Sequence, residues 1–144
     1  MFEIFWGEKT AAIMDFWTIE HFFSGIILAS FVQKFSQKIF EKTKISRSQK
    51  KYFNLIFILF LAYFWETIEH YLETGAAGKA VADWFCGVEF WANRILADPA
   101  MLLLGFFFAQ KFPRFFWPAR IFSFLWIFVH IFIFPHSMFL HEIF

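Results

Sequence analysis

The chain has 144 residues, of which 60% are hydrophobic, 26% are aromatic and only 17% are charged. Soluble domains average about 45–50% apolar residues, so this excess cannot all be buried in one small core. The apolar content also excludes a disordered chain, the single Cys86 excludes a disulfide scaffold, and the net charge of +1 excludes a nucleic-acid-binding protein. The sequence therefore predicts an all-α integral membrane protein with a single membrane domain over residues 1–144.

Four apolar stretches are predicted to cross the membrane as helices. A bilayer core about 30 Å thick requires roughly 20 residues of helix, because a helix rises about 1.5 Å per residue. In chain order, the predicted spans cover residues 12–36, 52–73, 98–112 and 118–134. The predicted fold is a bundle of four transmembrane helices, and an even number of spans places both termini on the same side of the membrane.

The connection between the second and third spans is predicted to form an amphipathic helix in the membrane surface, over residues 80–97. Apolar residues recur there at three- and four-residue steps, with Asn93 and Arg94 among the polar residues opposite them. A new helix is then expected to begin at Asp98-Pro99, because Asp is a good N-cap and Pro is favoured at the first helical position. The alternative is one helix that continues into the third span with a kink at Pro99.

The basic residues orient this bundle. Ten fall on one side of the predicted topology: Lys34, Lys38, Lys42, Lys44, Arg47, Lys50, Lys51, Lys111, Arg114 and Arg120. Three fall on the other side: Lys9, Lys79 and Arg94. The positive-inside rule therefore predicts that both termini lie outside the cytoplasm.

The acidic residues are distributed even more unevenly than the basic ones. Of the twelve, only Glu41 falls on the cytoplasmic side. A charge at the centre of a membrane helix costs about 2.5–3.5 kcal/mol, so acidic residues inside the spans require pairing, protonation, metal or water. The sequence thus predicts a polar site just beneath the outer surface of the membrane.

The phrase Thr-Ile-Glu-His occurs twice, at residues 18–21 and 67–70. If the first two spans are antiparallel, both phrases lie at the same depth. Carboxylates and imidazoles that converge from neighbouring helices are how helix bundles build metal sites, and such ligands suit zinc, manganese or non-haem iron. The candidate metal ligands are Asp15, His21, Glu66, Glu69, His70 and Asp98. Glu66, His21 and Asp15 are also the candidate catalytic groups, and Asn93 and Arg94 are candidate contacts to a substrate or lipid headgroup.

Several of these acidic residues also fit simpler structural roles that involve no metal or substrate. Glu20 and Glu73 fit polar caps at helix ends, Asp98 fits an N-cap, and Glu89 fits the solvated side of the surface helix. Gly25 and Gly105 are expected to let two helices approach closely.

The chain resembles a bacterial inner-membrane family known only as a domain of unknown function. Residues 15–25 resemble its first-span motif, in which Asp, an aromatic pair and Thr precede His and Gly at matching intervals. Residues 65–69 resemble its W-E-x-x-E box, and residues 93–106 resemble its N…D…G-F segment. The match extends from residue 15 to about residue 113, and more remotely the arrangement is similar to VanZ-like proteins, which are associated with resistance to glycopeptides. The resemblance implies a location in the bacterial inner membrane and supports these polar residues: Asp15, His21, Glu66, Glu69, Asn93 and Asp98.

Two classes of function remain. The first is an embedded site near the outer leaflet that binds a divalent metal and acts on a lipid or lipid-linked substrate. The second is a non-catalytic accessory or assembly subunit of a larger membrane complex, whose buried acids pair with a partner's basic residues. Whether the chain is an enzyme is left open by the sequence, and a proton or ion path is the weaker third possibility because only His130 lies in the inner half of a span.

Overall fold

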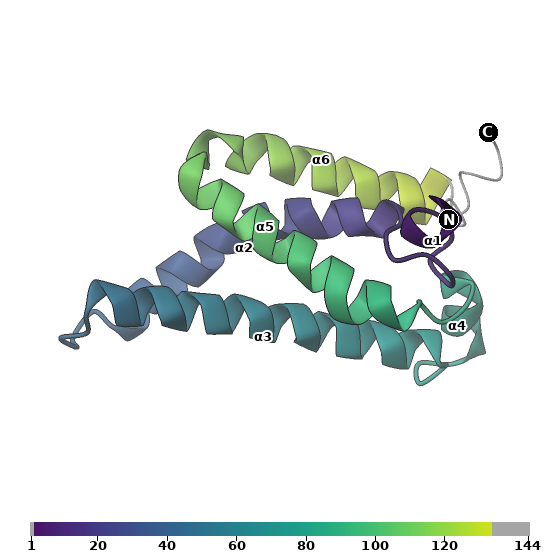
Figure 1. The fold of residues 1–144 in the computed structure, drawn as a ribbon, viewed down its shortest axis with the longest axis horizontal. Coiled ribbons are helices and arrows are strands. Elements are labelled where there is room, and N and C mark those ends of the chain that lie inside the picture. Colours follow the sequence, from purple (N-terminus) through teal and green to yellow (C-terminus); the bar gives the residue numbers. More distant parts are fainter. Residues whose placement is uncertain (1, 134–144) are drawn as a thin grey trace.

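The computed structural model describes residues 2–133, and within them the regular structure is helical (Figure 1). This confirms the all-α prediction. The elements in chain order are α1 (Phe2–Phe5), α2 (Phe16–Ile39), α3 (Arg47–Glu73), α4 (Lys79–Phe85), the π-helix η1 (Asn93–Ala97), α5 (Asp98–Lys111), the 3-10 helix η2 (Pro113–Phe115), α6 (Phe116–Phe128) and the π-helix η3 (Val129–Ile133).

The two longest helices, α2 and α3, begin at capping boxes. Asp15 Oδ1 accepts a hydrogen bond from the Thr18 backbone N–H at 3.0 Å, and Thr18 Oγ1 accepts one from the Asp15 N–H at 3.1 Å. Ser46 and Gln49 make the same reciprocal pair at the start of α3. Each box satisfies two backbone N–H donors that a helix start leaves free, and so fixes where the helix begins.

Helix α5 crosses α2 at two glycines, as the sequence predicted. A Cβ atom added at Gly25 would lie 2.0 Å from the Leu102 carbonyl oxygen, and one added at Gly105 would lie 1.9 Å from the Phe22 carbonyl oxygen. Only glycine fits at either position, because the two backbones are in contact there.

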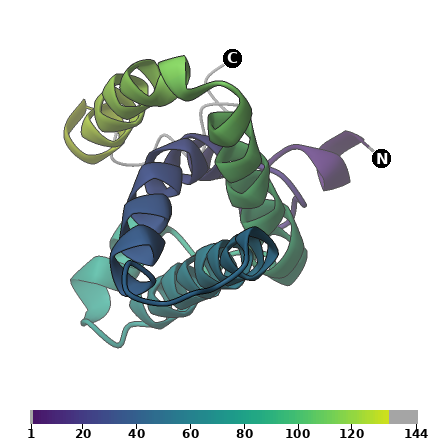
Figure 2. The same ribbon diagram turned by 90° about the vertical axis from the view of Figure 1, so that its left-hand side faces the viewer.

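The apolar core fills the space between α2, α3 and α5. Seen from one end of the molecule, these three helices form the sides of a triangle, and α6 packs outside it against α2 (Figure 2). The fully buried core residues are Ala29, Val32, Ile58, Ala62, Leu102 and Phe106. This packing holds the first residues of α2 and α5 close to the last residues of α3.

The structure corrects the predicted surface helix over residues 80–97. Helix α4 ends at Cys86, which is in the left-handed conformation with a φ of 56°, and Gly87 follows with a φ of 117°. Helical structure resumes at residue 91 and continues through η1 into α5. Asp98 is therefore not an N-cap, and the alternative of a helix continuing into the third predicted span is correct for residues 91–111.

A π-helical turn accommodates the proline in this continuous helix. Pro99 has no N–H, so it cannot bond the carbonyl of Ile95 four residues earlier. Tyr63 of α3 supplies the missing donor, because its hydroxyl donates to the Ile95 carbonyl at 3.1 Å. This bond also ties α3 to the helix beside the polar site described below.

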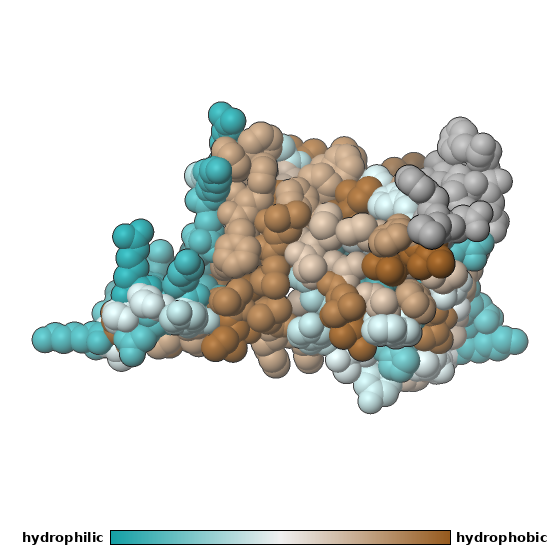
Figure 3. Space-filling view, viewed as in Figure 1, coloured by the Kyte–Doolittle hydropathy of each residue, from teal (hydrophilic) through white to brown (hydrophobic). Residues whose placement is uncertain are grey.

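Two helical stretches are long and apolar enough to cross a membrane: Arg47–Glu73 and Pro113–Ile133. Only 17% and 12% of their most apolar segments are buried inside the molecule, so most of their apolar side chains face outward. Figure 3 shows a broad apolar surface across the middle of one face, with hydrophilic residues at the ends. The last residue of the predicted fourth span, Phe134, lies outside the described residues, as do His136 and His141.

Candidate metal centre

Buried polar side chains gather at the end of the bundle where α2 begins and α3 ends (Figure 1). They come from the N-terminal segment, α2, α3, the connection after α4, η1 and α5. We call the following residues the acidic cluster: Lys9, Asp15, Thr18, His21, Glu66, Glu69, Glu73, Glu89, Asn93, Arg94 and Asp98. Because α2 and α3 are antiparallel, the two Thr-Ile-Glu-His phrases lie at this same end.

His21, Glu66 and Asp98 form the centre of the cluster. His21 Nε2 lies 3.0 Å from Glu66 Oε1, and His21 Nδ1 lies 3.4 Å from Asp98 Oδ2. All three residues are buried, and one potential ligand atom from each lies within 4.8 Å of the other two. Within residues 2–133, this is the group of side chains that could hold a metal ion.

The two ring nitrogens of His21 have different partners. Its Nδ1 lies 2.9 Å from the backbone carbonyl oxygen of Trp17, one turn earlier in α2. A carbonyl oxygen only accepts hydrogen bonds, so Nδ1 carries the hydrogen and donates it. Nε2 lies 3.0 Å from Glu66 Oε1, so it donates to that carboxylate, and a metal ion bound at Nε2 would have to replace this hydrogen; a backbone carbonyl at Nδ1 is a common support of metal-binding histidines.

The carboxylates around His21 make few hydrogen bonds, although they have ion-pair partners. Apart from the contacts with His21, both side-chain oxygens of Glu66 and both of Asp98 are buried and accept no hydrogen bond, and the same is true of Asp15 Oδ2 and Glu89 Oε2. A buried carboxylate without donors is costly unless it is protonated, paired or bound to a metal. His21 and Arg94 lie within 4 Å of several of these oxygens and supply part of that pairing.

The two permanent cations of the cluster are directed mainly to Glu73. Lys9 Nζ lies 2.5 Å from Glu73 Oε1, with both side chains almost completely buried, and Arg94 Nη2 pairs with Glu73 Oε2. Arg94 also lies 3.4 Å from Glu89 Oε2 and 3.9 Å from Glu66 Oε2. The partners of the two cations are therefore Glu66, Glu73 and Glu89, and Asp98 pairs with His21 instead.

Asn93 connects the capping box of α2 to the rest of the site. Its Oδ1 accepts a hydrogen bond from Thr18 Oγ1 at 3.1 Å, and its Nδ2 donates to Glu89 Oε1 at 3.1 Å. Asn93 is fully buried, so both of its polar atoms are used inside the molecule. These bonds fix the start of α2, and with it His21, relative to η1 and α5.

Glu89 lies outside the long helices and is surrounded by other acids. Burial, together with the negative charges of Asp98, Glu69, Glu66 and Asp15, raises the pKa of Glu89 to about 10. Glu89 is therefore protonated at neutral pH, despite its proximity to Arg94.

Several predicted site residues lie near the centre without belonging to it. Asp15 is used as the N-cap of α2, and Glu69 is half-buried and interacts electrostatically with Lys9 and Glu66. His70 is exposed, and its Nδ1 contacts Arg94 Nη1 at 3.2 Å.

The predicted contacts of Asn93 and Arg94 with a substrate or lipid are not favoured by this arrangement. Asn93 is enclosed, and the guanidinium of Arg94 is occupied by carboxylates. Glu20 faces another direction: its Oε1 accepts hydrogen bonds from Ser24 and from Ser123 of α6, so it is a buried link between helices.

Sequence reasoning missed the roles of Lys9, Glu73 and Glu89. Lys9 precedes the first span in a segment with no helical period, and only the folded chain brings it to Glu73, 64 residues away. The Phe90 N–H donates to the Lys9 carbonyl at 2.8 Å, which holds the N-terminal segment over the cluster. Glu8 adjoins Lys9 in the sequence, so no local signal pointed to a partner as distant as Glu73.

Neither a protein-family model, nor a curated protein, nor a solved structure matches this chain. The resemblance to the family of unknown function and to VanZ-like proteins therefore stays a prediction, and the function is inferred from the site itself.

Proposed function

We propose that this chain is a multi-pass protein of the bacterial inner membrane that binds one divalent metal ion through His21, Glu66 and Asp98. The site lies at the non-cytoplasmic end of the bundle and acts on a lipid or lipid-linked substrate. The observation that carries this proposal is the convergence of three buried side chains, His21, Glu66 and Asp98, with one potential ligand atom of each within 4.8 Å of the others.

The exposed apolar surface supports the membrane location. The core helix of a soluble protein would be mostly buried, whereas the apolar segments of Arg47–Glu73 and Pro113–Ile133 are only 17% and 12% buried. A bilayer is the solvent that makes such exposure favourable. We assign four spans to α2, α3, the helix over residues 91–111 and α6 with η3, and the basic loop between α2 and α3 to the cytoplasm.

The spacing of the central group supports a metal ion as its occupant. Ligand atoms about 2.1 Å from one ion lie roughly 3.0–3.4 Å apart in octahedral or tetrahedral geometry. The separation of His21 Nε2 from Glu66 Oε1 is 3.0 Å, and potential ligand atoms of His21, Glu66 and Asp98 lie within 4.8 Å of one another. Nitrogen and carboxylate ligands of this kind suit zinc, manganese or iron.

The charge balance supports the same assignment. With Glu89 protonated, five carboxylates of the acidic cluster remain: Asp15, Glu66, Glu69, Glu73 and Asp98. Lys9 and Arg94 pair with Glu73 at one side of the cluster, so its carboxylates outnumber its permanent cations. A divalent cation would neutralise most of this excess.

Such an ion would lower the pKa of a bound water toward about 7, which is the chemistry that hydrolysis of a lipid-linked ester, amide or phosphate requires. Asp15 keeps one buried oxygen without a donor and is the residue we assign to accept a proton. The exposed apolar helices that lead to the site would let a lipid reach it from the bilayer.

Metal analysis of the protein purified in detergent tests this assignment. We expect about one zinc, manganese or iron ion per chain, or uptake of one upon titration into chelator-treated protein. The variants His21→Gln, Glu66→Gln and Asp98→Asn should lose this ion. Glu20→Gln is the matched control, because Glu20 is also a buried acid of α2 but pairs with Ser123. A wild-type protein that neither contains nor takes up a divalent ion would refute the metal site.

The substrate class is tested by incubating metal-loaded protein with lipids from the outer leaflet and following the products by mass spectrometry. Turnover that the Glu66→Gln variant loses would support an enzyme.

The second candidate, an accessory or assembly subunit of a larger membrane complex, is favoured by a different observation. Phe57, Phe60 and Phe64 form a stacked row along α3, with interplanar angles of 9° and 15°. Phe60 and Phe64 are 58% and 54% exposed, so a neighbouring subunit could pack on this row. Co-purification with a defined membrane partner at fixed stoichiometry, lost when Phe60 and Phe64 are changed to Leu, would favour this role.

A further inference from the structure

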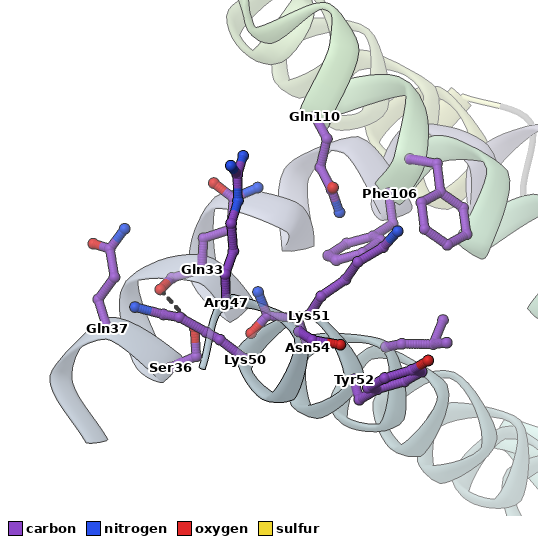
Figure 4. A pocket seen from close by; sticks show the side chains of 13 residues that line it. Gln33, Ser36, Gln37, Arg47, Lys50, Lys51, Tyr52, Asn54, Phe106 and Gln110 are labelled. Atoms are coloured by element: carbon purple, nitrogen blue, oxygen red, sulfur yellow. Dashed lines mark hydrogen bonds between the residues drawn. The ribbon is translucent and has the colours of Figure 1, made fainter. Parts of the chain in front are cut away.

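A second polar site lies at the end of the bundle opposite to the acidic cluster. There the last turns of α2, the first turns of α3 and the last turns of α5 enclose a pocket of about 900 Å³ (Figure 4). Figure 2 views the molecule from this end, with the three helices on the sides of a triangle. The pocket shares no residue with the metal centre, so the two sites are independent.

The charge of the pocket is entirely positive. Arg47, Lys50 and Lys51 line it, and none of the thirteen lining residues is acidic. Within residues 2–133, none of these three basic side chains forms an ion pair. Three unpaired like charges in one concave site repel one another, and a bound anion converts that repulsion into attraction.

The remaining lining gives the pocket polar and apolar parts. Side-chain amides of Gln33, Asn54 and Gln110 extend toward it from the three helices (Figure 4). The Oδ1 atom of Asn54 is buried and accepts no hydrogen bond, so it needs a donor. Phe106 and Phe107 of α5 form an apolar wall, and Phe107 is 43% exposed on the outer surface of the bundle.

These features of the pocket match an amphiphilic ligand that carries a negative charge and hydroxyl donors. A phosphate fits beside the basic side chains, because Arg and Lys are its usual ligands in proteins. A hydroxyl group next to that phosphate fits the free acceptor of Asn54. An acyl chain fits the apolar wall, which continues onto the exposed surface at Phe107.

We propose that this pocket binds an anionic glycerophospholipid of the cytoplasmic leaflet, with its phosphate held by Arg47, Lys50 and Lys51. Basic pockets between membrane helices on the cytoplasmic side are suited to such headgroups. The lipid bridges three helix ends, and it therefore stabilises the bundle at the end that the metal centre does not hold.

The proposal is tested with the full chain in nanodiscs of phosphatidylcholine, to which phosphatidylglycerol is added in increasing amounts. Native mass spectrometry counts the lipids that remain on the protein after release. We expect one phosphatidylglycerol to be retained at least tenfold better than phosphatidylcholine. The triple variant Arg47→Gln/Lys50→Gln/Lys51→Gln should lose this preference.

A matched control separates the pocket from the general charge of the loop. The triple variant Lys38→Gln/Lys42→Gln/Lys44→Gln removes the same number of charges from the same side of the chain, at residues that do not line the pocket. It should keep the preference. Equal retention of both lipids by the wild type, or equal loss in both triple variants, would overturn the proposal.

Two further measurements define the ligand. Asn54→Ala leaves the net charge unchanged and should weaken retention of phosphatidylglycerol by about fivefold, as expected for the loss of one hydrogen bond. Inorganic phosphate is the probe for a soluble ligand. If phosphate at millimolar concentration displaces the lipid and binds equally well in its absence, the pocket serves a soluble phosphate and the assignment to a lipid is wrong.

Discussion

The crossing of α2 and α5 at Gly25 and Gly105 offers the sharpest test of the fold, because two effects of one substitution have opposite signs. Alanine is a better helix former than glycine by about 1 kcal/mol, so Gly25→Ala would stabilise α2 if the new methyl group had space. The structure gives it none, since its Cβ would lie 2.0 Å from the Leu102 carbonyl oxygen. We therefore expect Gly25→Ala to destabilise the protein.

The size of the effect follows from the distance. An ordinary contact at this position is 3.4 Å or longer, so α5 must move away from α2 by roughly 1.4 Å. Forcing a methyl group into a packed interface typically costs about 1–3 kcal/mol. The same movement separates His21 on α2 from Asp98 on α5, whose side chains now lie 3.4 Å apart. A metal site tolerates displacements of only about 0.5 Å, so the affinity for the metal should fall along with the stability.

Thermal unfolding in detergent, followed by tryptophan fluorescence, and titration of the chelator-treated protein with zinc measure both effects. Gly105→Ala should behave like Gly25→Ala, because its Cβ would lie 1.9 Å from the Phe22 carbonyl oxygen. Ala100→Val is the control, since it enlarges an exposed position of α5. A higher melting temperature and unchanged zinc affinity for Gly25→Ala would refute the close contact of the two backbones.

Three further changes test the surroundings of the metal centre. Lys9→Met should cost about 3–5 kcal/mol of unfolding free energy, because it leaves the buried carboxylate of Glu73 without its cation, and chemical denaturation measures this loss. Glu89 has a pKa of about 10 in the folded protein, so the native state holds a proton that the unfolded chain releases above about pH 4.5. Stability should therefore fall as pH rises, by up to about 1.4 kcal/mol per unit, and Glu89→Gln should have a smaller slope between pH 6 and 9; equal slopes would contradict the assignment. Tyr63→Phe removes the donor to the Ile95 carbonyl and should cost about 0.5–1.5 kcal/mol, whereas an unchanged melting temperature would show that the bond contributes nothing.

Local sequence patterns predicted those features of the structure that depend on residues close together in the sequence, such as the helices. The apolar stretches gave helices close to the expected bounds, and the pair Gly25 and Gly105 indicated a close crossing before any partner helix was known. The sequence also placed His21, Glu66 and Asp98 in one polar site, and the structure brings them together, while their role as metal ligands stays a prediction. These successes rest on periodicity and on the high cost of placing charge in an apolar helix.

The repeated phrase Thr-Ile-Glu-His misled the prediction for His70. At about 100° per residue, the buried residues of α3 fall within an arc roughly 80° wide. His70 lies about 40° beyond the edge of that arc, so it is exposed although it follows Glu66 by one turn. An identical phrase in α2 places His21 inside because a different face of that helix meets its neighbours. Which face is buried depends on the other helices, and the phrase itself does not contain that information.

Tertiary contacts also explain the break in the predicted surface helix. The apolar period continues from residue 81 to residue 95, but Cys86 and Gly87 adopt positive φ values that end α4. The turn brings Glu89 beneath the N-terminal segment, where its N–H donates to Glu73 Oε2 at 3.1 Å. These long-range bonds outweigh the local preference for a continuous helix.

The buried pair of Lys9 and Glu73 also dictates an order of assembly. The ribosome adds about 5–20 residues per second, so roughly 3–13 s of synthesis separate the lysine from a partner 64 residues later. During that time the Lys9 side chain cannot be paired with Glu73, and the N-terminal segment cannot yet pack on the end of α3. The contact between the N-terminal segment and the end of α3 can therefore form only after Glu73 has been synthesised.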